Sequence, residues 1–233
     1  MPDSPTRSLR TARHGKDELL VVGGNGHDVG RHRRPTSQLV ADLTAWTVER
    51  FPGAVVTHTW SAQDYQSPNR VPFIGEMPRS QGRIHVATGY AKWGMTNAVS
   101  SGLRIATELL GSDPWWAKTI GRRVTRPKSM LRGAAAGLGV GKSAVEGWTG
   151  ALLSSLPETP PAEGQGVVAN SHGRPVGVCT VAGRTRTVSA VCPHLGGVLA
   201  WNDQETTWDC PLHGSRFTAD GTRIEGPATA DLG

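Results

Sequence analysis

The apolar positions follow one pattern in the first half of the chain and another in its last third. In the first half, short apolar runs alternate with longer segments in which apolar residues recur three or four positions apart, which is typical of buried strands and amphipathic helices. The expected strands are 19–22, 54–60 and 83–87, and the expected helices are 37–49 and 95–110. Residues 1–125 are therefore predicted to form a mixed α/β domain.

The pattern changes after residue 125. Residues 126–160 combine a helical run of small residues, 133–153, with a Pro-rich run, 156–161, that is typical of a domain boundary. Beyond it, short β-type runs alternate with turns that contain glycine. These runs are 166–169, 175–181 and 186–191. Residues 161–233 therefore predict a small all-β domain, and the whole chain predicts an α+β fold in three parts.

Composition and charge narrow the class of protein. The 233 residues are 37% hydrophobic and carry a net charge of +6. The basic residues are scattered and no recognition motif accompanies them, so nucleic acid is not expected as a partner. No apolar run is long enough to span a bilayer, and the N-terminal residues lack the hydrophobic core of a secretory signal. We therefore expect a cytoplasmic protein without a membrane span.

One constellation near the C-terminus specifies a chemistry. Cys192-Pro-His194 is followed by Cys210-Pro-Leu-His213, so that each of two short loops offers one sulfur and one imidazole ligand. A [2Fe–2S] centre of the Rieske type needs this set, because one iron takes two Cys and the other takes two His. The four residues are therefore candidate ligands of an iron–sulfur cluster.

A structural zinc site is the alternative for the same four residues. Two Cys and two His form a common zinc shell, but zinc fingers usually place like ligands together, as Cys-X(2–4)-Cys and His-X(3–5)-His. Here the ligand types are mixed within each loop, which favours the iron–sulfur interpretation. The third cysteine, Cys179, lies in the apolar run 176–182 and is expected to be a small core residue.

The residues around the four ligands strengthen the interpretation. Trp201-Asn202 follows the first loop, and His213-Gly-Ser-Arg-Phe217 closes the second. The whole stretch closely resembles the Rieske domain family. The resemblance implies a cluster held by the four residues, with Ser215 donating a hydrogen bond to a cluster sulfur.

Departures from the respiratory members of that family are also informative. Those members carry an additional Cys in each loop, and the two form a disulfide that ties the loops together. The matching positions here are Gly197 and Leu212, and Phe217 stands where they have a Tyr. The resemblance thus implies no bridge, fewer hydrogen-bond donors to the sulfurs, and a reduction potential below the respiratory value.

The first segment resembles a different family. Its motifs are 19–24, 60–65, 71–75 and 87–96. They are similar to the C-terminal portion of FAD-dependent oxidoreductases of the D-amino-acid oxidase type, in the branch that ends in a Rieske domain. In that family, the free N–H groups at the start of the helix expected near residue 96 would meet the flavin ring. The flavin-facing residues implied are Gly75, Gly89, Lys92, Trp93, Gly94, Met95 and Thr96.

The ADP-binding part of that family is not found in the sequence. Gly24-Asn-Gly26 with Gly30 is one residue too long for the Gly-X-Gly-X-X-Gly turn, no helix follows it directly, and the next expected strand lacks a ribose-binding acid. We therefore expect an incomplete FAD site in a chain that starts in the middle of a flavoprotein fold. Three explanations stay open: a truncated gene product, a gene-model fragment, and a partner half supplied by another chain.

These observations predict an oxidoreductase that transfers electrons through a Rieske [2Fe–2S] cluster, coupled in intact relatives to FAD-dependent substrate oxidation. The expected partner is a redox protein or the missing half of the flavoprotein, and no catalytic residue is identified. Two alternatives stay open: a standalone Rieske ferredoxin-type electron carrier, and a zinc-stabilised interaction module.

Overall fold

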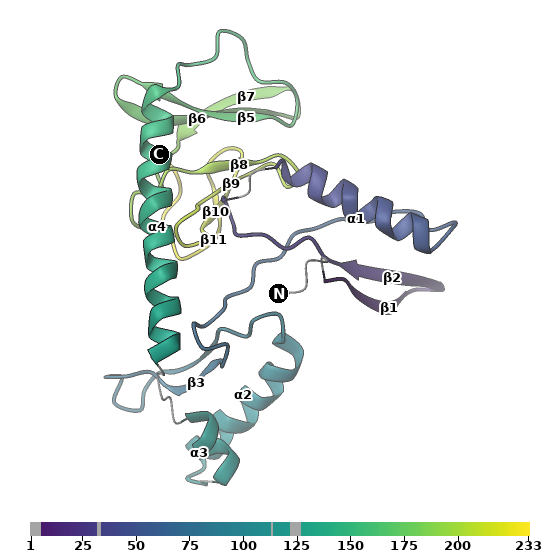
Figure 1. Ribbon diagram of the computed structural model, residues 1–233, viewed down its shortest axis with the longest axis vertical. Helices are drawn as coiled ribbons and strands as arrows, with labels where there is room; N and C mark the ends of the chain where they lie inside the picture. The colour runs from purple at the N-terminus through teal and green to yellow at the C-terminus, as the bar shows by residue number, and fades with distance from the viewer. Residues whose placement is uncertain (1–5, 32–33, 113, 122–126) are drawn as a thin grey trace. The chain divides into compact units, whose positions relative to one another are not determined.

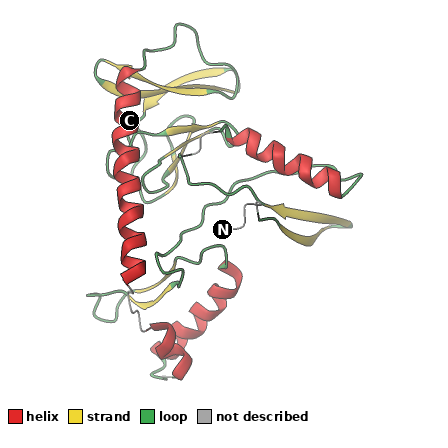
Figure 2. Ribbon diagram, viewed as in Figure 1, coloured by secondary structure: helices red, strands yellow, loops and turns green. Residues whose placement is uncertain are grey.

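The computed structural model describes residues 6–31, 34–112, 114–121 and 127–233. It is a mixed helix and sheet structure (Figures 1 and 2). By their contacts the residues form two compact units, one of Met1–Ser61 with Val140–Gly233 and one of Ala62–Gly139. The chain thus leaves the first unit after residue 61 and returns to it at residue 140.

The C-terminal part of the first unit is a small β-domain of two antiparallel sheets. A three-stranded sheet has the order β5-β6-β7, and a four-stranded sheet has the order β11-β10-β9-β8. The strands of the first sheet are β5 (Gly166–Ser171), β6 (Arg174–Val181) and β7 (Arg184–Ser189). Those of the second are β8 (Ala200–Asn202), β9 (Thr207–Asp209), β10 (Arg216–Thr218) and β11 (Arg223–Glu225). Each sheet is built from neighbouring hairpins, because short strands joined by tight turns pair locally.

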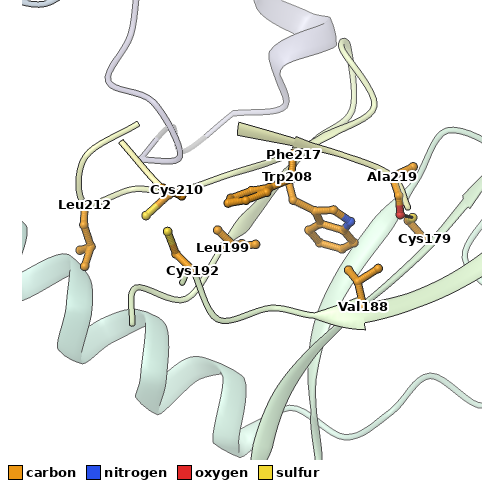
Figure 3. Close-up of a cluster of buried hydrophobic side chains, with 10 residues drawn as sticks. Cys179, Val188, Cys192, Leu199, Trp208, Cys210, Leu212, Phe217 and Ala219 are labelled. Carbon is orange, nitrogen blue, oxygen red and sulfur yellow. Dashed lines mark hydrogen bonds between the residues drawn. The ribbon is translucent and has the colours of Figure 1, made fainter. Parts of the chain in front are cut away.

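The core of the β-domain lies between these sheets (Figure 3). Trp208 and Phe217 of the second sheet are fully buried against Cys179 and Val188 of the first. Gly177 makes room for the larger ring, because a Cβ at this position would lie 2.8 Å from the indole of Trp208. The expectation for Cys179 is thus confirmed, since it is a buried core residue on β6.

The N-terminal part of the first unit consists of a hairpin, β1 (Ser8–His14) with β2 (Asp17–Gly23), and the helix α1 (Thr36–Arg50). The first residue of α1, Thr36, is buried, and its hydroxyl donates a 2.6 Å hydrogen bond to Asn202 Oδ1 in the β-domain. The helix therefore begins at the surface of the second sheet (Figure 1).

The second unit contains a hairpin, β3 (Phe73–Glu76) with β4 (His85–Thr88), against which the helices α2 (Gly94–Leu109) and α3 (Trp115–Gly121) lie. The helix α4 (Pro127–Leu153) begins in this unit and ends in the first. Few side chains of the second unit are buried, and many apolar side chains of α2 are exposed, including those of Met95, Val99 and Leu103.

Several predicted elements are confirmed with shifted ends. The expected helices 37–49 and 95–110 are α1 and α2, and the runs 166–169 and 175–181 lie in β5 and β6. The fold class, with a mixed N-terminal part and a C-terminal β-domain, is also confirmed. The predicted boundaries at residues 125 and 160 stay predictions.

The expected strand 54–60 is wrong. These residues are irregular, and the side chains of Val55 and Trp60 are 83% and 63% exposed. A strand needs a partner for its backbone N–H and C=O groups, and no neighbouring strand pairs with this run among the described residues. The strands β1 and β3 were not predicted, because their sequences lack a continuous apolar run. The three-residue strands β8, β9, β10 and β11 were not predicted either.

Candidate metal centre

The two ligand-bearing loops are built alike. In each loop the Cys N–H donates to the carbonyl five residues later, and the Cys carbonyl accepts from the N–H four residues later. The bonds are Cys192 N to Gly197 O (2.8 Å), Gly196 N to Cys192 O (3.0 Å), Cys210 N to Ser215 O (2.8 Å) and Gly214 N to Cys210 O (3.0 Å). Gly196 and Gly214 have φ of 69° and 81°, a left-handed conformation that glycine adopts without strain.

Ligands of the same type, one from each loop, lie next to each other. The thiols of Cys192 and Cys210 are hydrogen-bonded to each other, and both residues are 2% exposed (Figure 3). The rings of His194 and His213 lie edge to face with their centroids 5.1 Å apart, and both residues are exposed. The fold thus sorts four ligands that are mixed along the sequence into a buried sulfur pair and an exposed imidazole pair.

The sulfur pair shares a proton unequally. The hydrogen bond from the Cys210 thiol lowers the pKa of Cys192 to about 6. The same contact, with burial, raises the pKa of the Cys210 thiol. One thiolate is therefore available at neutral pH, and the thiolate is the form of cysteine that binds metals.

Further hydrogen bonds end on the two sulfurs. The Cys192 sulfur accepts from the backbone of His194 and from the hydroxyl of Ser215. Ser215 is fully buried, and its oxygen accepts in turn from the Ala228 N–H at 2.9 Å. The Cys210 sulfur accepts from the backbone of Leu212 and His213. These donors favour the negatively charged form of each sulfur, but at Cys210 the contact with Cys192 and burial outweigh them and the pKa is raised.

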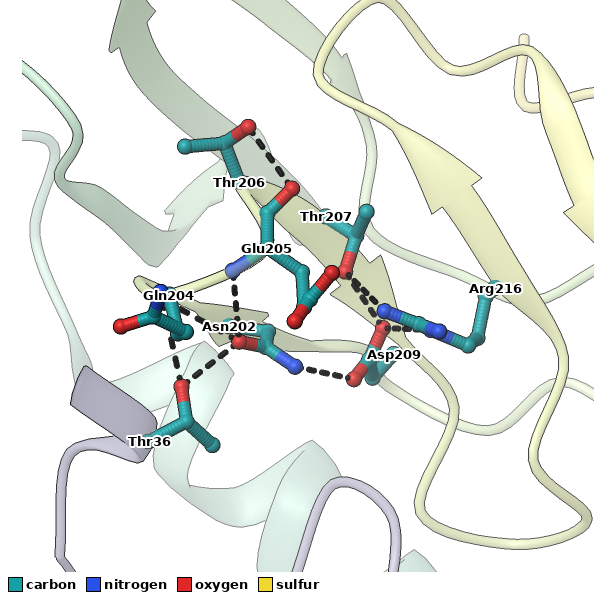
Figure 4. A network of polar contacts seen from close by, with 8 residues as sticks. All are labelled: Thr36, Asn202, Gln204, Glu205, Thr206, Thr207, Asp209 and Arg216. Carbon is teal, nitrogen blue, oxygen red and sulfur yellow. Dashed lines mark hydrogen bonds and ion pairs between the residues drawn. The ribbon is translucent and has the colours of Figure 1, made fainter. Parts of the chain in front are cut away.

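A buried ion pair closes the base of the second loop. Asp209 ends β9 and Arg216 begins β10, and the two are cross-strand partners with Arg216 Nε 3.2 Å from Asp209 Oδ1 (Figure 4). Asn202 and Thr207 donate to the same carboxylate at 2.9 and 2.8 Å. Burying charges costs free energy unless they are paired and hydrogen-bonded. Because both charges in this network have such partners, the network fixes the distance between the two ends of the second loop.

This donor set fits a [2Fe–2S] cluster. The cluster takes two thiolates at one iron and two imidazoles at the other, and the structure offers one pair of each kind. In the part of the chain that the structure describes, no three His, Cys, Asp or Glu side chains converge on one point that could hold a single metal ion. A two-iron cluster does not need such a point, since each iron takes two protein ligands.

Two side chains outside the β-domain sequence also hold the loops. Arg31 Nε donates to the Pro211 carbonyl at 2.6 Å, and Trp148 Nε1 of α4 donates to the Gly196 carbonyl at 2.9 Å. Sequence reasoning missed both residues, because they lie 180 and 48 positions from the carbonyls that they bind. The only signal was Gly30, which the sequence placed in a glycine-rich turn.

The expected flavin-facing residues are all in the second unit. Residues 92–96 are exposed around the start of α2, and Gly89 precedes them with φ of 78°. Gly75 is buried beside Arg104 and Glu108, near the other end of that helix. The structure thus brings six of the seven residues together and sets Gly75 apart, and their contact with a flavin stays a prediction.

Comparison with known proteins agrees with both parts of this description. Residues 2–108 match the family model of FAD dependent oxidoreductases, and residues 155–233 match that of the Rieske [2Fe-2S] domain. The chain joins an FAD-dependent oxidoreductase segment to a Rieske domain. The Rieske domain implies a [2Fe–2S] cluster, and the oxidoreductase segment makes FAD a second candidate cofactor.

Individual relatives cover different parts of the chain. A Bacillus subtilis (strain 168) protein named as a Rieske 2Fe-2S iron-sulfur protein is 31% identical over 99% of this chain and 45% of its own length. Cytochrome b6-f complex iron-sulfur subunit 2 of Synechocystis is 47% identical over 19% of this chain and 25% of its own length. The chain therefore spans less than half the length of either curated relative.

Among solved structures, the plasma membrane Rieske protein of Synechocystis PCC 6803 is 32% identical and covers 29% of this chain and 70% of its own, with a TM-score of 0.27. Within the described ranges, no helix has the length and apolar character needed to cross a membrane.

Proposed function

We propose that this protein transfers single electrons through a [2Fe–2S] cluster held by Cys192, His194, Cys210 and His213, as the electron-transfer part of a flavin-linked oxidoreductase. The observation that carries the proposal is the sorting of the ligands into a sulfur pair and an imidazole pair by two loops of the same construction. Such a cluster accepts and releases one electron at a time, at a potential set by its ligands and their hydrogen bonds.

The residues around the ligands give the centre one open side. Both cysteines are buried with Leu199 and Phe217, whereas both histidines are exposed and the adjacent Leu195 is 65% exposed. Electrons would therefore enter and leave at the imidazole edges. The net charge of +6 favours an acidic redox partner, either a separate protein or the remainder of the flavoprotein. A cytoplasmic location stays a prediction.

The expected potential is below that of respiratory members of the family. Phe217 is fully buried in the core and has no hydroxyl to donate to a sulfur. The side chain of Leu212 fills the space beside Gly197, because a Cβ on Gly197 would lie 2.6 Å from the Cγ of Leu212. An apolar contact therefore stands where the respiratory members have a disulfide between the loops. With fewer donors, the reduced cluster is less stabilised and the potential falls.

Metal and sulfide analysis of anaerobically purified protein tests the proposal. We expect two irons and two acid-labile sulfides per chain and the electron paramagnetic resonance signal of a reduced Rieske centre. Cys192→Ala should abolish the cluster, whereas Cys179→Ala, which removes a buried cysteine outside both loops, should retain it. Stoichiometric zinc without labile sulfide would instead show the zinc-stabilised interaction module.

The structure also supports the second candidate, a ferredoxin-type carrier without a flavin. Residues 1–61 form one compact unit with the Rieske domain. This part of the oxidoreductase segment would therefore be a structural part of the electron carrier and would not need to bind a flavin. An absorption spectrum distinguishes the two functions, because only the flavin-linked one predicts that flavin binds when the remainder of the oxidoreductase is added.

A further inference from the structure

Arg31 binds two successive carbonyls of the second cluster loop. Its Nε donates to the Pro211 oxygen at 2.6 Å and its Nη2 to the Leu212 oxygen at 3.4 Å. The planar fork of a guanidinium suits two neighbouring acceptors, and its permanent charge makes these hydrogen bonds stronger than neutral ones.

Each of these carbonyls belongs to a peptide group whose N–H faces the cluster ligand. The Pro211 carbonyl shares a peptide group with the Leu212 N–H, and the Leu212 carbonyl shares one with the His213 N–H. Both N–H groups donate to the Cys210 sulfur. Arg31 and the sulfur therefore bind opposite ends of the same two peptide groups.

The neighbouring glycine permits this approach. A Cβ on Gly30 would lie 2.9 Å from the Pro211 nitrogen and 3.0 Å from the Asp209 carbonyl oxygen, and Gly30 has φ of 65°. A side chain would thus push the segment away from the loop, in a conformation that other residues rarely adopt. The glycine that resembles part of a phosphate-binding turn is used here for contact with the cluster loop.

We propose that Arg31 is a positioning residue for the Cys210 sulfur: through two peptide groups it orients and strengthens the hydrogen bonds to that sulfur, and it thereby raises the reduction potential of the centre. Hydrogen bonds in a chain polarise one another, so a cation at the carbonyl end makes the N–H end a better donor. Reduction adds negative charge to the cluster, and donors to its sulfurs favour that state.

The inference deepens the proposed function, on which it rests. Arg31 lies in residues 2–108, which match the FAD-dependent oxidoreductase family, whereas the loop lies in residues 155–233, which match the Rieske domain. The segment that matches the oxidoreductase family thus supplies a residue that binds a ligand-bearing loop of the Rieske domain. A Rieske domain cut out at residue 155 would lack this contribution.

The experiment compares midpoint potentials of the full chain and three variants. Arg31→Gln removes the charge and the fork, and Arg31→Lys keeps the charge but cannot bind two carbonyls in the same planar geometry. Arg34→Gln is the matched control, because it removes one charge from the same segment at an exposed side chain that pairs with Asp42. Hydrogen–deuterium exchange of the Leu212 and His213 amides is measured in parallel.

For Arg31→Gln we expect the equilibrium constant for reduction to fall about tenfold, which is about 59 mV for a one-electron couple. Arg31→Lys should fall between this variant and the wild type, and the two amides should exchange faster in both variants. Arg34→Gln should resemble the wild type.

Two results would overturn the inference: a potential for Arg31→Gln no lower than that of Arg34→Gln, or unchanged exchange of the two amides. If a variant loses its cluster, the exchange rates of the Leu212 and His213 amides are compared between its apoprotein and the apo wild type. Unchanged rates in that comparison would also overturn the inference. Wild-type protein without iron and sulfide would refute the proposed function itself, which is a separate outcome.

Discussion

Single residues decide which hydrogen bonds the two buried sulfurs of the candidate centre accept. Ser215 is the clearest example, because its hydroxyl group is fully buried and links the Cys192 sulfur to the Ala228 N–H. The Ala228 N–H occupies a lone pair of the oxygen, which leaves the hydroxyl proton directed to the sulfur. This arrangement lets the Ser215 hydroxyl donate to the Cys192 sulfur, and its role toward a bound cluster, which the Rieske resemblance implies, stays a prediction.

Ser215→Ala should therefore lower the reduction potential without loss of the cluster. We expect a shift of about tenfold in the equilibrium constant for reduction, or about 59 mV, since one donor to a sulfur is lost. Redox titration measures it. Ser171→Ala in the β5–β6 hairpin is the control and should leave the potential unchanged. An equal potential in both variants would exclude a hydrogen bond from Ser215.

At the scale of elements, the attachment of α1 to the turn between β8 and β9 ties the N-terminal segment to the Rieske domain. The Asp203 carboxylate accepts from the N–H and hydroxyl of Ser37 and from the hydroxyl of Thr36, at the start of the helix. A carboxylate at this end satisfies free N–H groups and interacts favourably with the helix dipole. The helix is therefore capped by a residue from another element.

Asp203→Asn should weaken this attachment in a pH-dependent manner. Burial raises the pKa of Asp203, but the hydrogen bonds from Ser37 and Thr36 outweigh it and lower the pKa below its ordinary value. The carboxylate therefore contributes stability above the unfolded-state pKa of about 3.9, and this contribution is lost as pH falls through the folded-state pKa. We expect a loss of about 1 kcal/mol at neutral pH, typical of a helix cap.

Thermal unfolding of both proteins across pH measures this effect. The difference between wild type and Asp203→Asn should be constant at neutral pH and should shrink below about pH 4. Asp42→Asn removes an exposed carboxylate from the same helix and should change stability little, since surface ion pairs contribute about 0–1 kcal/mol. A difference that persists undiminished in strong acid would contradict the role of the charge.

At the scale of the whole molecule, the part that matches the FAD-dependent oxidoreductase family is divided between two units. Residues up to 61 belong with the Rieske domain, and residues 62–108 belong to the other unit, which holds the expected flavin-facing residues. Gly30, from the glycine-rich turn, lies against the second ligand-bearing loop of the Rieske domain.

The chain by itself should therefore bind FAD weakly or not at all. The start of α2 presents free N–H groups to solvent, but one helix end supplies only part of the anchoring of a dinucleotide. Flavin fluorescence titration should show no tight binding, and gel filtration should remove added FAD while the iron content is retained. One FAD per chain after gel filtration would show a complete flavin site.

The prediction of the fold succeeded where local pattern and neighbouring partners coincide. The strands β5, β6 and β7 and the helices α1 and α2 have clear periodicity, and their ends differ from prediction by one or two residues. The run 54–60 has the apolar character of a strand, but backbone pairing, which depends on other segments, decided against it. The partners of Arg31 and Trp148 were unpredictable for the same reason, since contacts between distant segments leave no local signal.

The sequence by itself determined the candidate chemistry, because the spacing of Cys192, His194, Cys210 and His213 within two short Pro- and Gly-containing loops is a local property of the chain. The pairing of sulfur with sulfur and imidazole with imidazole was decided by the tertiary structure, because it requires two loops of the same construction to lie next to each other. The contact of Arg31 with the second loop was likewise decided by packing, since only the fold brings residues 180 positions apart within hydrogen-bonding distance.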